Sequence, residues 1–392
     1  MRTLLFSLLL LALGGCASTP QAPRGEGCAP CAPCAACPGA EPAKPPEKPL
    51  QPAAWSDLPG WEADDLRPAF EAFRTSCVRL EKQAIWRAVC ADARSVANGI
   101  DLKAWFEARL SPWQLVNPDG NREGLVTGYY EPVLRGSRSF GKPYVHPVFA
   151  PPGDMITVEL ADLYPELKHM RLRGRIEGRK LVPYWSRAEW SQQEEGRATD
   201  AILWLDDALD FFFMQIQGSG QVQLDDGSRL RLGYADQNGH PYRSIGRWLI
   251  DQGELQSGQA SMQGIKAWAK ANPRRVQELM NANPSLVFFR ELPAEGSGPP
   301  GAMGLPLTPE RSIAVDPRSV PLGVPVFLAT TWPDDPRPLQ RLMVAQDTGG
   351  AIRGAVRADF YWGSGPEAGA LAGRMKQKGR MWALMPLGYA PK

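Results

Sequence analysis

The stretch "RLMVAQDTGGAIRGAVRADFY" (residues 341–361) decides the fold, because two short apolar runs flank a glycine-rich segment. Runs of this length, separated by glycine and proline, are typical of strands in a barrel or a sandwich. Similar runs surround it, namely "RSIAV" (311–315), "VPVFLA" (324–329) and "RMWALMP" (380–386). We therefore expect a β-rich C-terminal region that one helix, over residues 365–379, interrupts.

The same stretch holds two carboxylates in poorly solvating company. Asp347 is followed by glycine and small apolar residues, and Asp359 lies between Ala358 and Phe360. A carboxylate among apolar neighbours is costly unless it is protonated or hydrogen-bonded. The two aspartates are therefore either catalytic or structural. The commonest structural task of an aspartate beside glycine is to cap a turn.

The beginning of the chain predicts export. Arg2 precedes the apolar run "LLFSLLLLAL", and "LGGC" ends at Cys16. Such a run is typical of a secretory signal and is too short to span a bilayer. The Leu-Gly-Gly-Cys ending resembles a bacterial lipobox, which implies a signal peptide over residues 1–15 and lipidation of Cys16. By the same resemblance, Ala17 in place of aspartate implies transfer to the outer membrane.

Residues 16–54 are expected to form an extended tether. They are rich in proline and alanine and contain few large apolar residues, so they cannot build a core. Their cysteines at 28, 31, 34 and 37 recur at every third position. A metal or iron–sulfur site is one interpretation of this spacing. Disulfides are favoured, because no histidine accompanies the cysteines and export leads to an oxidising compartment.

The rest of the chain, from about Trp55 to Lys392, is longer than an average domain and favours two. Its acidic and basic residues nearly balance, with a formal net charge of +2 for the whole chain, so nucleic acid is a poor candidate partner. The three histidines are scattered, and no zinc-binding spacing occurs outside the tether. The sequence therefore predicts neither a metal site nor a cofactor.

Two cysteines lie in a segment with helical periodicity. One apolar face is formed by Leu66, Phe70, Phe73, Cys77 and Leu80. An unbroken helix over residues 66–90 would hold Cys77 and Cys90 ~20 Å apart, beyond disulfide reach. Because an oxidising compartment favours pairing, we predict a helix break near residues 81–84 and a Cys77–Cys90 disulfide.

Other local signals divide the middle of the chain. Asp101 is a plausible cap for a second helix, and Pro132 should confine a strand over residues 125–134 to an edge or an exit of a sheet. The Asp226-Gly227 pair predicts a hairpin, and Asn272-Pro273 should break a helical segment. The residue pattern of the sequence changes at about residue 132, and a loop-like segment follows over residues 293–304.

The carboxylates allow more than one chemistry. Asp347-Thr348-Gly349 spells the triplet of aspartic peptidases, but it occurs once, so a peptidase would have to be a homodimer. The other chemistry is cleavage of a glycosidic bond, in which a carboxylic acid protonates the leaving oxygen. The 13 tryptophans suit sugar faces and serve equally well in a core, so they support this only weakly.

Four motifs together resemble the membrane-bound lytic murein transglycosylase A family. They are "GYYEP" (128–132), "MQIQGSG" (214–220), "NGHPYRSIG" (238–246) and "DTGGAIRG…ADFYWGSGPEAG…AG" (347–373). They occur in the family's order and spacing, and the resemblance extends from about Trp55 to Leu387.

The resemblance implies a mainly β fold with some α structure. A double-psi β-barrel domain would comprise residues 55–131 and 292–390, with a three-aspartate module at about 305–388. A second β-rich domain, residues 132–291, would be inserted into the barrel domain. The groove between the two domains would bind the substrate.

The resemblance also assigns residues. Asp359 matches the family's catalytic general acid and base, and Asp347 its supporting neighbour. The residues that match the substrate-binding set are Thr127, Tyr129, Gln215, Gln217, Ser219 and Asp316. Arg357-Ala358 stands at a variable position of the motif.

The activity implied is that of a peptidoglycan lytic transglycosylase, a lyase that cleaves between N-acetylmuramic acid and N-acetylglucosamine and leaves 1,6-anhydromuramic ends. One carboxylate suffices, because the C6 hydroxyl of the substrate is the nucleophile. The expected partners are peptidoglycan glycan strands, the outer membrane through a lipid anchor facing the periplasm, and cell-wall synthases. A non-catalytic, anchored glycan-binding protein is the alternative from another functional class.

Overall fold

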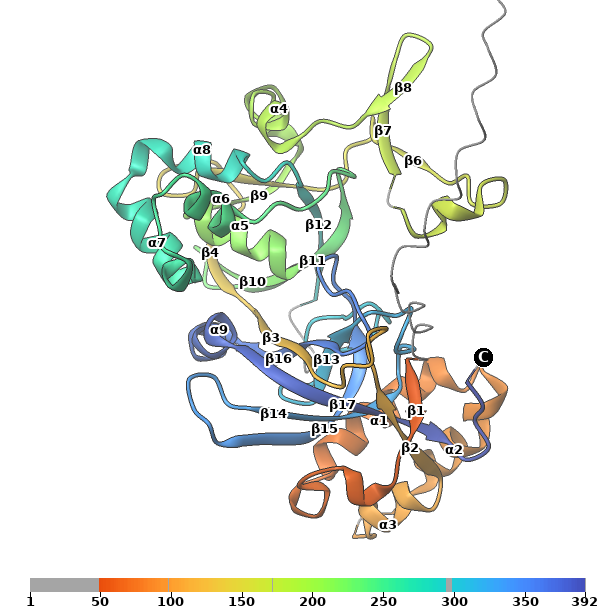
Figure 1. The fold of residues 1–392 in the computed structure, drawn as a ribbon. Coiled ribbons are helices and arrows are strands. Elements are labelled where there is room, and N and C mark those ends of the chain that lie inside the picture. Colours follow the sequence, from red (N-terminus) through yellow and green to blue (C-terminus); the bar gives the residue numbers. More distant parts are fainter. Residues whose placement is uncertain (1–48, 98, 171, 294–297, 392) are drawn as a thin grey trace, which may run out of the picture. The chain divides into compact units, whose positions relative to one another are not determined.

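The central feature of the fold is a ring of strands from distant parts of the chain. The computed structural model describes residues 49–97, 99–170, 172–293 and 298–391. Cys16, the signal segment and the tether cysteines lie outside these residues. The largest sheet has the order β1-β2-β17-β14-β15-β13-β16-β3, and β17 also pairs with β3, so six of its strands close on themselves. Strands near both ends of the described chain, orange and blue, share this sheet (Figure 1).

The strands of this sheet are β1 (Leu50–Pro52), β2 (Leu110–Leu115), β3 (Gly124–Glu131), β13 (Ser312–Val315), β14 (Pro325–Thr331), β15 (Pro338–Asp347), β16 (Arg357–Ser364) and β17 (Lys376–Pro386). The pairs β16–β3 and β13–β15 are parallel, whereas the other pairs are antiparallel. Strand β1 lies within the stretch that we expected to be tether. It belongs to the fold because Leu50 is buried in the main core.

Residues of the ring alternate between two faces. On β16, Ala358, Phe360 and Trp362 belong to the main hydrophobic core. A smaller apolar cluster forms on the opposite face, with Tyr129, Leu307, Ala314, Ile352 and Tyr361. This alternation is the two-residue period of a strand. It places Asp359, between Ala358 and Phe360, on the face of the smaller cluster.

The C-terminal helix is shorter than predicted. Helix α9 (Gly365–Arg374) begins with Pro366 in its first turn, as expected, but ends before Lys376. The following residues form strand β17, in which Lys376 pairs with Thr127 and Gly379 with Gly124. A Cβ atom on Gly379 would lie 2.7 Å from Val126 Cγ2. Gly379 therefore permits close strand approach and does not terminate a helix, because long-range pairing overrides the local helix signal.

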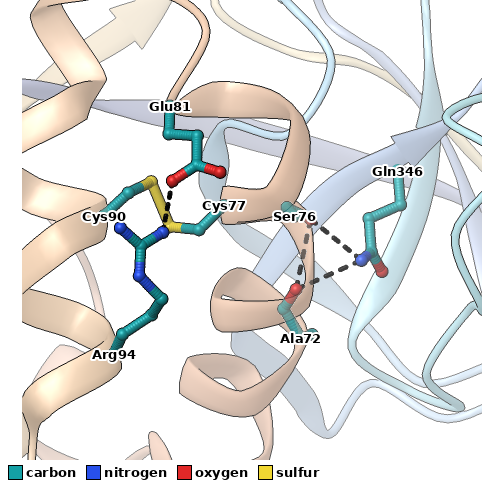
Figure 2. Close-up of a disulfide and its surroundings, with 7 residues drawn as sticks. All are labelled: Ala72, Ser76, Cys77, Glu81, Cys90, Arg94 and Gln346. Carbon is teal, nitrogen blue, oxygen red and sulfur yellow. Dashed lines mark hydrogen bonds and ion pairs between the residues drawn. A yellow bond between two sulfur atoms is a disulfide. The ribbon is translucent and has the colours of Figure 1, made fainter.

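Two helices pack on the ring and are joined by a disulfide. Helices α1 (Arg67–Leu80) and α2 (Ala84–Ser95) are separated at the predicted break. Cys77 and Cys90 are bonded, with their Cα atoms 5.3 Å apart, and an ion pair between Glu81 and Arg94 lies beside the bond (Figure 2). A short helix, α3 (Leu102–Glu107), follows, and the Asp101 side chain accepts a hydrogen bond from Ala104 N as predicted.

Residues 133–292 contain two further sheets. The six-stranded sheet comprises β4 (Val133–Ser137), β5 (His146–Phe149), β9 (Ala201–Leu205), β10 (Ser219–Leu224), β11 (Arg229–Gln237) and β12 (Val287–Leu292). The three-stranded sheet comprises β6 (Ile156–Val158), β7 (Leu172–Glu177) and β8 (Lys180–Pro183). The helices of this region are α4 (Arg187–Ser191), α5 (Ala208–Gln217), α6 (Ile245–Asp251), α7 (Met262–Ala271) and α8 (Val276–Asn281).

Local sequence signals in this region are confirmed. Strands β10 and β11 form the antiparallel hairpin predicted from Asp226-Gly227. The helical segment is broken between α7 and α8, at Asn272-Pro273. The single strand expected over residues 125–134 is divided at Pro132, where the chain leaves β3 and enters β4 of the next sheet. Within the described residues, every helix is too short or too polar to cross a lipid bilayer.

A buried ion pair ties the ring to the six-stranded sheet. Glu131, at the end of β3, is fully buried and accepts hydrogen bonds from Arg231 Nε at 2.6 Å and Ser364 Oγ at 2.7 Å. Gln221 Nε2 donates a third bond, at 2.9 Å. The three partners of this β3 carboxylate come from β10, β11 and β16. A cation and two neutral donors on separate strands therefore compensate the buried charge.

Candidate active site

The strand register brings the two aspartates of the opening stretch together. On β13, Ala314 pairs with Asp359 of β16 on one side and with Asp347 of β15 on the other. Asp359 also pairs with Thr127 of β3. Residues at one level of adjacent strands project to the same face. The two carboxyl groups therefore project from one surface, on either side of a single small residue.

Asp359 is held by a neighbouring hydroxyl. Thr127 Oγ1 donates a hydrogen bond of 2.5 Å to Asp359 Oδ1. Arg357 Nη2 donates to the same hydroxyl oxygen at 2.9 Å. The side chain of Asp359 is half-buried, so it is largely shielded by protein and still reachable from outside.

Asp347 accepts hydrogen bonds on both of its oxygens. Ala302 N and Thr348 N donate to Oδ1, each at 2.9 Å, and the Tyr129 hydroxyl donates to Oδ2 at 3.1 Å. The Tyr129 ring also packs against Tyr361, with centroids 5.2 Å apart. All three donors are neutral, so Asp347 has hydrogen bonds without a cation among them.

A β-bulge gives Asp347 its orientation. The register between β13 and β15 shifts after Ile313, so Asp347 rather than Gln346 lies opposite Ala314. Gln346 instead points to helix α1 and donates from Nε2 to Ser76 Oγ at 2.9 Å and to the Ala72 carbonyl at 3.2 Å (Figure 2). The bulge sends adjacent polar side chains to opposite sides of the strand.

Burial dominates the electrostatics of both aspartates. It raises the pKa of Asp347 to about 6, against the three hydrogen bonds, and the nearby charge of Asp359 adds to the rise. Burial also raises the pKa of Asp359, against the Thr127 hydrogen bond and the charge of Arg357. The pKa of Tyr129 is raised well above its usual value by burial and by both carboxylates. Tyr129 therefore stays a neutral donor at physiological pH.

Asp316 follows β13 and behaves differently. It is buried, and both of its oxygens accept hydrogen bonds from the Arg318 guanidinium, at 2.6 and 2.9 Å. Together with a bond from Gly354 N, these contacts lower the pKa of Asp316 to about 2 against burial. Gly354 has φ +108°, a conformation that favours glycine. Asp316 thus fixes the end of the glycine-rich loop.

The residues predicted from "MQIQGSG" separate into two places. Gln217 Oε1 accepts a bond of 3.1 Å from Tyr130 N, next to Tyr129. Gln215 is buried, accepts from Arg187 Nη2 at 2.6 Å and lines a cavity of about 70 Å³ within residues 146–288. Ser219 is half-buried at the start of β10, where it pairs with Gly233. Of the hydrogen bonds described for these three residues, the one to Gln217 comes from the strand that carries Thr127 and Tyr129.

The arrangement can support proton transfer. A half-buried carboxyl with a raised pKa keeps its proton closer to neutral pH than an ordinary aspartate does and can act as a general acid. A second carboxyl and an apolar floor lie beside it. Among the described residues, no group of three His, Cys, Asp or Glu side chains is arranged to hold a metal ion.

Sequence reasoning missed several contributors to this site. Arg357 stands at a variable position of the family motif, and the backbone N–H of Ala302 lies in the predicted loop-like segment over residues 293–304. The bulge at Gln346 depends on contacts with helix α1, more than 260 positions earlier, since the Gln346–Ser76 separation is 270. The available signal was a glutamine, Gln346, directly after the apolar run "LMVA".

Comparisons with known proteins give a consistent result. Residues 125–290 match the family model of the MltA specific insert domain, and residues 311–385 match that of the 3D domain. The chain is 32% identical over 295 residues to the membrane-bound lytic murein transglycosylase A of Escherichia coli K12, covering 73% of this chain and 72% of the relative.

Solved structures agree. The crystal structure of MltA from Neisseria gonorrhoeae has a TM-score of 0.77 and 39% identity, covering 90% of this chain and 99% of that one. The structure of Escherichia coli MltA with bound chitohexaose has a TM-score of 0.64 and 28% identity, with 88% and 93% covered.

Proposed function

Because this chain belongs to the membrane-bound lytic murein transglycosylase A family, we propose that it is a peptidoglycan lytic transglycosylase. It cleaves the β-1,4 bond between N-acetylmuramic acid and N-acetylglucosamine and thereby serves cell-wall remodelling and turnover. The observation that carries the proposal is the placement of Asp359 and Asp347 on one face, at one level, with raised pKa values. The structure of a relative with bound chitohexaose supports glycan strands as the ligand.

In the proposed mechanism, Asp359 acts twice. Its neutral carboxyl donates a proton to the glycosidic oxygen as the bond from C1 breaks. The resulting carboxylate accepts the proton of the muramic C6 hydroxyl, whose oxygen bonds to C1. The carboxyl is regenerated and a 1,6-anhydro ring forms without water. The attack is intramolecular, so it benefits from proximity.

The other site residues have supporting roles in this proposal. Asp347 orients the sugar and places a second carboxyl beside the developing positive charge on C1. Thr127 holds Asp359, and Tyr129 holds Asp347, through the hydrogen bonds described above. Gln217 and Ser219 bind the glycan directly. Asp316 acts through the loop that it fixes at Gly354, and Gln215 through its bond to Arg187.

The proposal includes an arrangement and a location. The ring of strands is a double-psi β-barrel formed by residues 55–131 and 292–390, with residues 132–291 inserted and the glycan in the groove between them. Lipidation of Cys16 anchors the protein to the outer membrane, facing the periplasm, where cell-wall synthases are its partners. Relatives named membrane-bound support association with a membrane.

Product analysis tests the proposed function. Digestion of isolated peptidoglycan should yield 1,6-anhydromuramic ends, detected by mass spectrometry, and no reducing muramic acid. Asp359→Asn keeps the shape of the side chain and removes the transferable proton. Turnover should fall towards the upper end of the ~10²–10⁴-fold range of general acid–base catalysis, while glycan binding survives.

Each alternative has its own outcome. Mainly reducing ends would identify a hydrolase and contradict the mechanism. Full activity of Asp359→Asn would remove this residue from the chemistry. Glycan binding without any cleavage by the unaltered protein would identify an anchored binding protein. Cleavage of protein substrates would favour the peptidase interpretation of Asp347-Thr348-Gly349.

A further inference from the structure

Arg357 is held firmly beside the proposed general acid. Its Nη1 donates to the Leu125 carbonyl at 3.3 Å and to the Ala358 carbonyl, and its Nη2 donates to Thr127 Oγ1 at 2.9 Å. The guanidinium is thus fixed by two backbone carbonyls and one hydroxyl. A guanidinium has no acceptor, so Thr127 must be the acceptor in the contact between them.

This contact orients the hydroxyl of Thr127. A hydrogen bond from a cation polarises the hydroxyl, which strengthens it as a donor and weakens its oxygen as an acceptor. The Thr127 hydroxyl donates to Asp359 Oδ1 at 2.5 Å. The chain of donors therefore runs in one direction, from Arg357 through Thr127 to Asp359, and Oδ1 is an acceptor.

The other carboxyl oxygen is left for the proton. Within the residues that the structure describes, no protein group donates a hydrogen bond to Asp359 Oδ2. Resting on the proposed function of Asp359 as general acid, we propose that Arg357 is a positioning residue that confines the transferable proton of Asp359 to Oδ2. Without this constraint the proton would be shared with Oδ1, where it faces Thr127 instead of the substrate.

Arg357 also sets how readily Asp359 gives up the proton. Its positive charge lowers the pKa of Asp359 against the effect of burial. Other groups around Asp359 do not replace this charge. Asp347 on β15 is acidic, and Tyr129 on β3 is a neutral donor. Lys376 of β17 pairs with Thr127 on the side away from β16, and its side chain is exposed. On α9, Glu367 is exposed and Arg374 is paired with Asp334.

The test compares pH profiles of three variants with that of the full-length protein. Arg357→Met should lower kcat about tenfold. It should also move the alkaline limb of the kcat/KM profile to a pH about one unit higher, because loss of the positive charge raises the pKa of Asp359. Arg357→Lys should keep the limb near its original pH, since the charge remains. Arg380→Met, which removes an exposed arginine stacked on Trp382, should change neither quantity.

A double-mutant comparison tests the path through Thr127. Thr127→Val should lower kcat as Arg357→Met does. In the Thr127→Val background, Arg357→Met should lower kcat by a smaller factor than it does in the original protein, because the two groups act in series. A ¹³C NMR titration of the Asp359 carboxyl should show its pKa rising in Arg357→Met, independently of activity.

Unchanged kcat, pH profile and NMR titration in Arg357→Met would overturn the proposal for Arg357. The proposal would also be contradicted if the losses in kcat of Arg357→Met and Thr127→Val added up fully in the double variant. If Asp359→Asn keeps its activity, the proposed function itself fails, and the two failures are thereby distinguished. Thermal unfolding of each variant identifies any loss that comes from misfolding.

Discussion

Carboxylates shielded from solvent in two regions of this protein have opposite partners. Glu131 is fully buried and receives a guanidinium and two neutral donors. Asp347 and Asp359 lie on one face of neighbouring strands, and the donors that contact their oxygens are all neutral. The guanidinium of Arg357 reaches Asp359 through Thr127.

The difference separates a carboxylate that holds the structure from one that can exchange a proton. A cation in direct contact keeps a carboxylate ionised, as Arg318 does for Asp316, whose pKa is lowered to about 2. Without such contact, burial dominates and favours the neutral acid. The ring of strands and its loops thus contain both kinds, and the strand register determines which carboxylate meets a cation.

The first and largest stability effect is expected at Glu131. Glu131→Gln leaves Arg231 buried without its counter-charge, which typically costs about 3–5 kcal/mol of unfolding free energy. Chemical denaturation should measure this loss. Glu291→Gln is the matched control, because its pair with Arg138 is exposed and should contribute at most about 1 kcal/mol.

The same measurement on Asp359→Asn should give the opposite result. Replacing a poorly compensated buried carboxyl with a neutral amide should leave the unfolding free energy unchanged or raise it, although turnover collapses. A loss of stability comparable to that of Glu131→Gln would show that Asp359 is structural and would erase the distinction between the regions.

A second effect concerns the helices behind Asp347. Replacing Cys77 and Cys90 with alanine should lower the stability by about 3 kcal/mol, since the disulfide closes a loop of 13 residues. Turnover at low temperature should be retained, because the contacts from Gln346 to Ser76 and Ala72 do not include sulfur. A loss of turnover in folded protein would mean that the disulfide supports the site as well as the fold.

The smallest effect is a pH dependence of stability from Asp347. Its folded-state pKa, about 6, exceeds the ordinary value, so the folded protein binds this proton more tightly. The contribution is fully present below about pH 4 and is lost as the pH rises to about 6. Since Asp347 is half-buried, we expect about 1–2 kcal/mol, measured as the difference between the original protein and Asp347→Asn.

If the difference in unfolding free energy between the original protein and Asp347→Asn stays constant over pH 4–6, the raised pKa of Asp347 is contradicted. A difference that grows with pH would mean that the carboxylate, and not the neutral acid, is the form that the fold prefers. Either outcome would place Asp347 with Glu131 and Asp316 in the structural class.

The sequence predicted features whose cause is local. The apolar face of α1, the Asp101 cap and the Asp226-Gly227 hairpin depend on residues close together in the chain, and all three are found. The disulfide was predictable because an oxidising compartment favours pairing of Cys77 and Cys90, and helix geometry permits the bond only if the helix is broken. The family motifs indicated Asp347 and Asp359 as candidates, and the structure places both on one face.

What escaped prediction depends on distant parts of the chain. Residues 376–379 have helical character locally and become strand because they pair with β3. The Glu131–Arg231 contact spans 100 positions, and the bulge at Gln346 requires helix α1. Arg357 looked variable in the motif because its partner, Thr127, is 230 positions away. Periodicity and turn signals contain no information at such separations.

The closure of the ring by β17 has a consequence for how the protein is made. This strand, residues 376–386, follows β2, β3 and β14 in the chain, and it pairs with all three. Non-local pairing of this kind forms late. A chain in which β17 is not yet present cannot close the ring of strands beside Thr127. Synthesis of β17 therefore precedes assembly of the site, so that the chain becomes active only after this strand has been made.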